Sequence, residues 1–197
     1  KCYGLNRFSE DLDFTSENKI DTKKIENGLK RFNIEYEIKT KEYDNEQKTT
    51  LRIKGPLFIG ISQSLCKLII DISLREKVIL KPNIKTIGRF LEEIPIFDIF
   101  AMQEKEILAE KIRAIMTRSK ARDIYDLWFL MDQDVKFDKK LAKEKLKFYK
   151  EKWDAKEFAG KIDIKKTIWN NELRYLLPNV PDFQKTKESI IKKMKIQ

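Results

Sequence analysis

An alternation of acidic and apolar residues near the start of the chain constrains its fold most strongly. In the segment Arg7-Phe8-Ser9-Glu10-Asp11-Leu12-Asp13-Phe14, a β-strand would send Leu12 and Phe14 to one face and Asp11 and Asp13 to the other. The two carboxylates would then stand about 7 Å apart along the strand. Oxygen ligands at this spacing suit a hard divalent ion such as Mg²⁺. A surface strand with a polar outer face is the alternative interpretation.

A third acid lies inside the most apolar stretch of the sequence. Residues 65–74 read Leu-Cys-Lys-Leu-Ile-Ile-Asp-Ile-Ser-Leu, which predicts a central strand with Asp71 between two isoleucines. A buried carboxylate without a partner is costly, so Asp71 is expected to face a cation, a metal or a cleft. A structural ion pair remains the alternative to a site.

The first half of the sequence alternates between helix and strand signals, and the second half is helical. We expect a helix over 21–32 with Asp21 as N-cap, strands over 34–43 and 49–54, and helices over 103–118 and 122–130. Apolar stripes at helical spacing follow, Ala142 to Trp153 and Ile164 to Leu176, then a last helix over 182–194. The predicted fold class is α+β, a mixed sheet with flanking helices in residues 1–102 followed by a helical bundle in 103–197.

Charged side chains also fall on the apolar faces of two of these helices. Lys111 lies within the stripe that Ile107 and Ile115 define, so it either extends outward to solvent or reaches a cleft beside phosphates. Asp123 and Asp126 lie one turn apart on a helix that is apolar almost all round. They need cationic partners, and Lys111, Arg118 and Arg122 are the candidates. Structural pairing alone could explain this cluster.

Composition narrows the chemistry further. The 197 residues include no histidine, which excludes Ser-His-Asp catalysis and His-ligated zinc, so carboxylates, lysines and metal ions must carry any transfer reaction. The two cysteines, the absence of a signal-peptide pattern and the absence of a membrane-length apolar run indicate a cytoplasmic protein. Residues 136–197 hold 18 lysines and arginines against 9 acids. This excess of positive charge indicates a surface that binds phosphates, and the alternative is a solvated lysine-rich surface without a ligand.

Together, four segments resemble one family. They are the segment 7–14, the strand Leu68-Ile69-Ile70-Asp71-Ile72-Ser73, Glu110-Lys111-Ile112-Arg113-Ala114, and Lys120-Ala121-Arg122-Asp123-Ile124-Tyr125-Asp126-Leu127. The sequence is similar, over about residues 1–132, to the AbiEii-type nucleotidyltransferase toxins of the DNA polymerase beta superfamily. The superfamily places a Gly-Ser or Gly-Gly-Thr turn before its acid pair, and we expect that element upstream of Lys1.

The resemblance implies an activity and a set of roles. Asp11 and Asp13 match the metal-binding acid pair, and Asp71 matches the third acid, shared by metal binding and catalysis. Lys111 matches a lysine that faces the nucleotide. Asp123 is favoured over Asp126 as the match to the acid of the last motif. The resemblance implies that Lys111 and Asp123 are catalytic and bind the nucleotide. The implied reaction moves a nucleoside monophosphate from an NTP to an acceptor hydroxyl with Mg²⁺ or Mn²⁺. The implied partners are tRNA or another RNA and a cognate antitoxin, with no membrane.

Two readings without catalysis stay open. In one, the chain is a basic nucleic-acid-binding module whose nucleotidyltransferase-type sheet has lost its activity, and its binding weakens steeply with salt. In the other, the helical half docks a protein partner through apolar helix faces, with little dependence on ionic strength.

Overall fold

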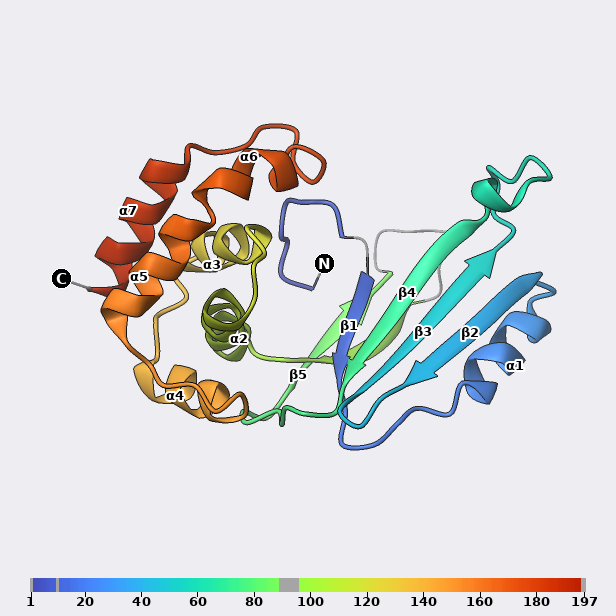
Figure 1. Ribbon diagram of the computed structural model, residues 1–197. Coiled ribbons are helices and arrows are strands. Elements are labelled where there is room, and N and C mark those ends of the chain that lie inside the picture. Colours follow the sequence, from blue (N-terminus) through green and yellow to red (C-terminus); the bar gives the residue numbers. More distant parts are fainter. Residues whose placement is uncertain (1, 10, 89–95, 196–197) are drawn as a thin grey trace. The chain divides into compact units, whose positions relative to one another are not determined.

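The computed structural model describes residues 2–9, 11–88 and 96–195, and within these ranges the chain forms two compact units. Residues 9–77 form one unit, and residues 1–8 together with 78–197 form the other. Glu10, quoted in the first acidic motif, lies outside the described residues. Figure 1 shows both units, a sheet with one helix and a set of packed helices. The predicted mixed α+β fold class is confirmed.

A mixed sheet with the strand order β1-β4-β3-β2 forms the smaller unit. Its elements are β1 (Asp11–Thr15), α1 (Lys23–Arg31), β2 (Tyr36–Glu42), β3 (Glu46–Ile53), a 3₁₀ turn (Ser62–Ser64) and β4 (Cys66–Ser73). β1 runs parallel to β4, whereas β3 runs antiparallel to both β2 and β4 (Figure 1). The predicted central strand is confirmed, because β4 lies between β1 and β3.

The two faces of this sheet differ in polarity, as alternation along each strand requires. On one face Leu51 and Ile72 are buried, and the Gln47 amide is buried with them. That amide accepts from the Ile20 N–H at 2.8 Å and donates to the Ile20 carbonyl at 2.9 Å, which ties the segment before α1 to β3. The other face carries the charged side chains of the unit.

The element bounds in this unit correct two details of the prediction. Thr22, not Asp21, is the N-cap residue of α1, although the Asp21 carboxylate still accepts from the Lys23 N–H at 3.0 Å. β3 begins at Glu46, three residues before the predicted start, because the tight connection 43–45 leaves Glu46 and Gln47 paired with β4. The earlier start brings Lys48 into the sheet.

Helices dominate the larger unit. Its elements are β5 (Asn83–Ile87), β6 (Phe97–Ala101), α2 (Glu104–Thr117), α3 (Arg122–Asp132), α4 (Lys139–Lys147), α5 (Ala155–Ile164), α6 (Lys166–Leu173) and α7 (Phe183–Met194). β5 and β6 form a separate antiparallel pair that the sequence analysis did not predict. None of the helices in the described ranges is long and apolar enough to cross a membrane.

The hydrophobic core of this unit lies among the helices (Figure 1). Ile112 of α2, Leu127 of α3, Leu146 of α4, Ile162 of α5 and Leu173 of α6 are each fully buried in it. The helices predicted over 103–118, 122–130 and 182–194 are confirmed as α2, α3 and α7.

The two apolar stripes between α3 and α7 are more broken than predicted. α4 ends at Lys147, so Trp153 lies in the connection after it. The second stripe is divided between α5 and α6, and its first member, Ile164, is 71% exposed. A stripe at helical spacing does not reveal such breaks, because short helices can each supply part of it.

Candidate active site

Asp11, Asp13 and Asp71 lie on one face of the sheet. In the register between the parallel strands, Asp13 is directly beside Asp71 and Asp11 is beside Ile69. Register partners in adjacent strands point to the same face, and residues two apart in a strand share that face. The prediction that Asp11 and Asp13 share one face of a strand is therefore confirmed. Asp13 is exposed, and Asp11 and Asp71 are half-buried.

A lysine that the sequence analysis missed neutralises the third acid. Lys48 of β3 is the register partner of Asp71 on the side away from β1, and its Nζ donates to Asp71 Oδ2 at 2.9 Å. The hydrogen bond to Asp71 raises the pKa of Lys48, burial opposes this, and the charges of Asp71 and Asp11 add to the rise. Asp71 thus faces a cation, as its position in the strand required.

The acid face suits an ion that arrives with a nucleotide better than an ion held by protein alone. Within the described ranges, no three His, Cys, Asp or Glu side chains gather closely enough to hold a metal ion. Mg²⁺ is usually held by one or two carboxylates together with substrate phosphates and water, rather than by an all-protein cage. Asp11 and Asp13 supply such a pair, on an accessible face.

Lys111, Asp123 and Asp126 form a second cluster, in the helical unit. Lys111 projects from α2 and its Nζ lies 3.2 Å from Asp123 Oδ1 and 2.6 Å from Asp126 Oδ2, both on α3. The Asp123 side chain is 0% exposed and that of Asp126 is 3% exposed, whereas Lys111 keeps 21% exposure. Lys111 therefore bridges two buried carboxylates, and part of its side chain remains exposed.

Two arginines complete this cluster. Arg118 makes a two-pronged contact with Asp123, with 2.8 Å from Nε to Oδ2 and 2.8 Å from Nη2 to Oδ1. Arg7 does the same for Asp126, at 2.6 Å from Nε to Oδ1 and 2.9 Å from Nη2 to Oδ2. Such paired N–H groups match the geometry of a carboxylate, and they leave each acid held from two sides.

These partners keep both carboxylates ionised despite their burial. Burial would raise the pKa of Asp123, but the hydrogen bonds from Arg118 and the charges of Lys111 and Arg118 lower it to about 2. The pKa of Asp126 is likewise lowered, because Lys111 and Arg7 outweigh the effect of burial. Lys111 is the central member, because it contacts both carboxylates while each arginine contacts one of them.

The structure brings the predicted residues together in two groups, Asp11, Asp13 and Asp71 in the sheet unit and Lys111 and Asp123 in the helical unit. Lys111 and Arg118 had been named as partners of the α3 acids, and Arg7 had not. Arg7 could not be found from the sequence, because 119 residues separate it from Asp126. Lys48 could have been found by extending the strand alternation of Thr50 and Arg52 backward by one step.

Comparison with known proteins identifies a family for this chain. The family model described as "Nucleotidyl transferase AbiEii toxin, Type IV TA system" matches residues 1–190. No curated protein and no solved structure matches the chain. Because the matched region covers nearly the whole sequence, the chain belongs to the AbiEii family of nucleotidyltransferase toxins of type IV toxin–antitoxin systems.

Proposed function

We propose that this protein is a metal-dependent nucleotidyltransferase that moves a nucleoside monophosphate from an NTP to an acceptor hydroxyl and releases pyrophosphate. The observation that carries the proposal is the register of β1 and β4, in which Asp13 stands beside Asp71 on the face that also carries Asp11. Family membership supports the transferase class.

Asp11 and Asp13 are the proposed metal ligands. They are acceptor-only oxygen donors on one accessible face, the donor type that Mg²⁺ and Mn²⁺ prefer. The ion, when bound, would screen the charge of the triphosphate and polarise its phosphorus–oxygen bonds. The two carboxylates would fix where the triphosphate lies on the sheet.

Asp71 is the proposed base for the acceptor hydroxyl and shares in holding the metal. Lys48 engages Oδ2 of this carboxylate, so Oδ1 is the oxygen that would take the proton. The 2.9 Å contact from Lys48 Nζ orients the Asp71 carboxylate, and a base must be positioned in this way before the acceptor arrives. As the proton moves to Oδ1, the acceptor oxygen attacks the α-phosphorus and pyrophosphate leaves.

Lys111 is the proposed phosphate-binding residue of the helical unit. Its side chain is 21% exposed, and its ammonium group is held between the carboxylates of Asp123 and Asp126. Asp123 is wholly buried behind Lys111, so we propose that it contributes to nucleotide binding and catalysis by orienting the ammonium group. Asp126 shares that task through its own 2.6 Å contact with Lys111.

The proposed acceptor is an RNA, with tRNA as the first candidate. Residues 136–197 carry twice as many basic as acidic side chains, which suits a polyanion better than a neutral protein hydroxyl. Family membership supports a cognate antitoxin as a further partner, and we propose that the protein acts in the cytoplasm.

The test is a label-transfer assay with the full-length protein carrying its natural N-terminus. Each α-labelled NTP is incubated with Mg²⁺ and total tRNA, and the label is followed on RNA and on protein after digestion with protease or nuclease. The proposal predicts label on RNA that EDTA abolishes. Label on protein would overturn the RNA acceptor, and no label with any NTP would overturn the transferase activity of this chain.

The second candidate function is a basic nucleic-acid-binding module without catalysis. The Lys48–Asp71 ion pair favours it, because a lysine already neutralises the third acid of the face. This candidate predicts RNA binding that falls steeply with salt and is indifferent to Mg²⁺ and to the acid pair.

A further inference from the structure

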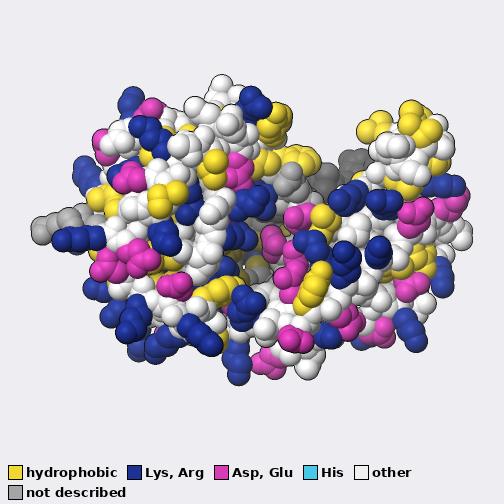
Figure 2. Space-filling view, viewed as in Figure 1, with side chains coloured by type: hydrophobic (Ala, Val, Ile, Leu, Met, Phe, Trp, Pro, Cys, Tyr) yellow, Lys and Arg dark blue, Asp and Glu magenta, His cyan; other side chains and the backbone are white. Residues whose placement is uncertain are grey.

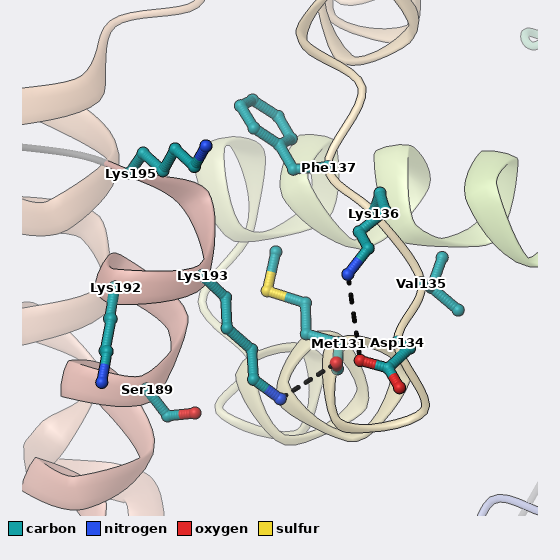
Figure 3. A pocket seen from close by; sticks show the side chains of 9 residues that line it. All are labelled: Met131, Asp134, Val135, Lys136, Phe137, Ser189, Lys192, Lys193 and Lys195. Carbon is teal, nitrogen blue, oxygen red and sulfur yellow. Dashed lines mark hydrogen bonds and ion pairs between the residues drawn. The ribbon is translucent and has the colours of Figure 1, made fainter.

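A pocket in the helical unit shares no lining residue with the two acid clusters described above. It has a volume of about 590 Å³ and is formed by the end of α3, the connection 133–138 and the last turns of α7 (Figure 3). This volume is in the range of pockets that hold a small ligand or one extruded nucleotide.

The pocket combines an apolar wall with a strongly basic rim. Met131, Val135 and Phe137 supply the apolar wall. Lys136, Lys192, Lys193 and Lys195 supply the charge, and Asp134 is the acid among the lining residues. In Figure 3, Lys193 and Lys195 extend from α7 toward the opposite wall, and Lys136 reaches in from the connection. The balance of the lining is three positive charges.

The lysines differ in how far they are already engaged. Lys193 donates to the Met131 carbonyl at 3.0 Å and pairs with Asp132 at 3.2 Å. Lys136 lies 3.9 Å from Asp134, and both side chains are more than 80% exposed, so this pair contributes little. Among the described residues, no ion pair engages Lys192 or Lys195. These two cations are available to a ligand.

Phe137 is held as a fixed surface rather than a mobile one. The centroid of its ring lies 5.3 Å from the centroid of the Trp153 ring. The Trp153 centroid in turn lies 5.2 Å from that of the buried Phe158 ring. Aromatic packing of this kind fixes the ring against the core. A flat, fixed ring beside lysines is the arrangement on which nucleic-acid bases stack while cations hold the backbone.

We infer that this pocket binds a nucleotide of a single-stranded nucleic acid, with the base against Met131, Val135 and Phe137 and the phosphates on Lys192 and Lys195. The inference rests on the proposed function in taking the acceptor to be a nucleic acid. Among the residues that the structure describes, the lining contains no Arg, Asn or Gln. Every base has a flat face that can stack on an aromatic ring, so binding through Phe137 is tolerant of sequence.

Charge beyond the pocket favours a strand over a single nucleotide. Lys139, Lys140, Lys143 and Lys147 continue the basic surface along α4, and Figure 2 shows lysine and arginine side chains gathered over that helix. A mononucleotide would not use these charges, whereas a backbone that leaves the pocket would. A duplex cannot offer an unstacked base to a concave wall.

The test measures binding of a fluorescein-labelled ten-nucleotide RNA of mixed sequence by anisotropy, without Mg²⁺ or NTP. The variant Lys192→Gln/Lys195→Gln removes two pocket charges, and Lys81→Gln/Lys105→Gln removes two exposed charges of the helical unit outside the basic region 136–197 as the matched control. We expect about tenfold weaker binding for the pocket variant and a salt slope smaller by about 1.4, with the control close to wild type.

A second pair of variants isolates charge from size at one position. Ser189 lines the pocket from α7, and Ser189→Glu differs from Ser189→Gln in charge but hardly in volume. The inference predicts that the glutamate weakens RNA binding several times more than the glutamine does. Circular dichroism of both variants excludes loss of the helix as the cause.

Three outcomes would overturn the inference. In the first, the pocket variant and its control weaken RNA binding equally. In the second, the protein binds the duplex of the same sequence as tightly as the single strand. In the third, polyglutamate displaces the labelled RNA as effectively as unlabelled RNA does. The last outcome would assign the surface to an acidic protein instead. Because the assay contains neither Mg²⁺ nor NTP, its result stands apart from success or failure of nucleotide transfer.

Discussion

Arg7 and Asp126, 119 residues apart in the sequence, form a two-pronged ion pair with N–O distances of 2.6 and 2.9 Å. Arg7 is the second-last residue before the chain enters the sheet unit at Ser9. The backbone next to it is held as well, because the Phe8 N–H donates to the Leu176 carbonyl at 2.9 Å. Asp126 therefore contacts Lys111 and also holds the segment before Ser9 against α3.

A similar contact holds the segment where the chain returns from the sheet. The carboxylate of Glu106, buried on α2, accepts from the N–H groups of Ile79 and Leu80 at 2.7 and 2.8 Å. The buried ammonium of Lys145 lies 2.6 Å from the same carboxylate and 2.8 Å from Glu110. Within the helical unit, the segments that precede Ser9 and follow Lys77 are thus attached to α3 and α2 through buried acids.

Removing the Asp126 charge should destabilise the helical unit. In Asp126→Asn, Arg7 and Lys111 lose a buried partner, and uncompensated buried charge costs about 3–5 kcal/mol. Denaturant unfolding followed by tryptophan fluorescence reports on this unit, because Trp128, Trp153 and Trp169 all belong to it. The exposed ion pair of Asp163 with Lys187 supplies the control Asp163→Asn, which should cost less than about 1 kcal/mol. Equal losses in the two variants would contradict the role of Asp126.

Acid should weaken the protein through Asp123. Its pKa is lowered from 3.8 to about 2, so its contribution is complete above pH 3.8 and is lost as the pH falls toward 2. A shift of this size corresponds to about 2 kcal/mol. The free energy of unfolding, measured between pH 6 and pH 2, should fall more steeply for the wild type than for Asp123→Asn. Parallel curves would show that Asp123 is not the group that titrates.

Removing the Lys48 charge should strengthen metal binding at the acid face. In Lys48→Met, Asp71 loses its cation, and the field at Asp11 becomes more negative. The affinity for Mn²⁺, followed by electron paramagnetic resonance, should rise by roughly threefold to tenfold. Lys41 of β2 is the exposed register partner of Lys48, so Lys41→Met is the matched control and should change little. Unchanged or weaker Mn²⁺ binding in Lys48→Met would contradict this role.

Local patterns in the sequence predicted the parts of the fold that local physics determines. Alternation placed Asp11 and Asp13 on one face, apolar density placed β4 inside the sheet, and helical periodicity located α2, α3 and α7. Two acids on an apolar helix predicted cationic partners for Asp123 and Asp126. Lys111 and Arg118, both among the predicted candidates, form ion pairs with Asp123.

Features that depend on distant pairing were not predictable in this way. The contact of Arg7 with Asp126 depends on where the leading segment packs, which no local pattern encodes. The pairing of β5 with β6 and the break between α5 and α6 depend on tertiary packing that overrides weak local preference. β3 begins at Glu46 because Glu46 and Gln47 pair with β4. The predicted start at residue 49 was too late, and Lys48 was therefore left out of the strand.

The most direct test of the account compares the acid pair with matched acids in the same unit. In the label-transfer assay, Asp11→Asn/Asp13→Asn removes the proposed metal ligands, and Asp21→Asn/Asp44→Asn removes two exposed carboxylates of the sheet unit that lie outside the strands. The account predicts that transfer falls by at least about a hundredfold in the first variant and stays near wild type in the second. Equal transfer by wild type and Asp11→Asn/Asp13→Asn would contradict it.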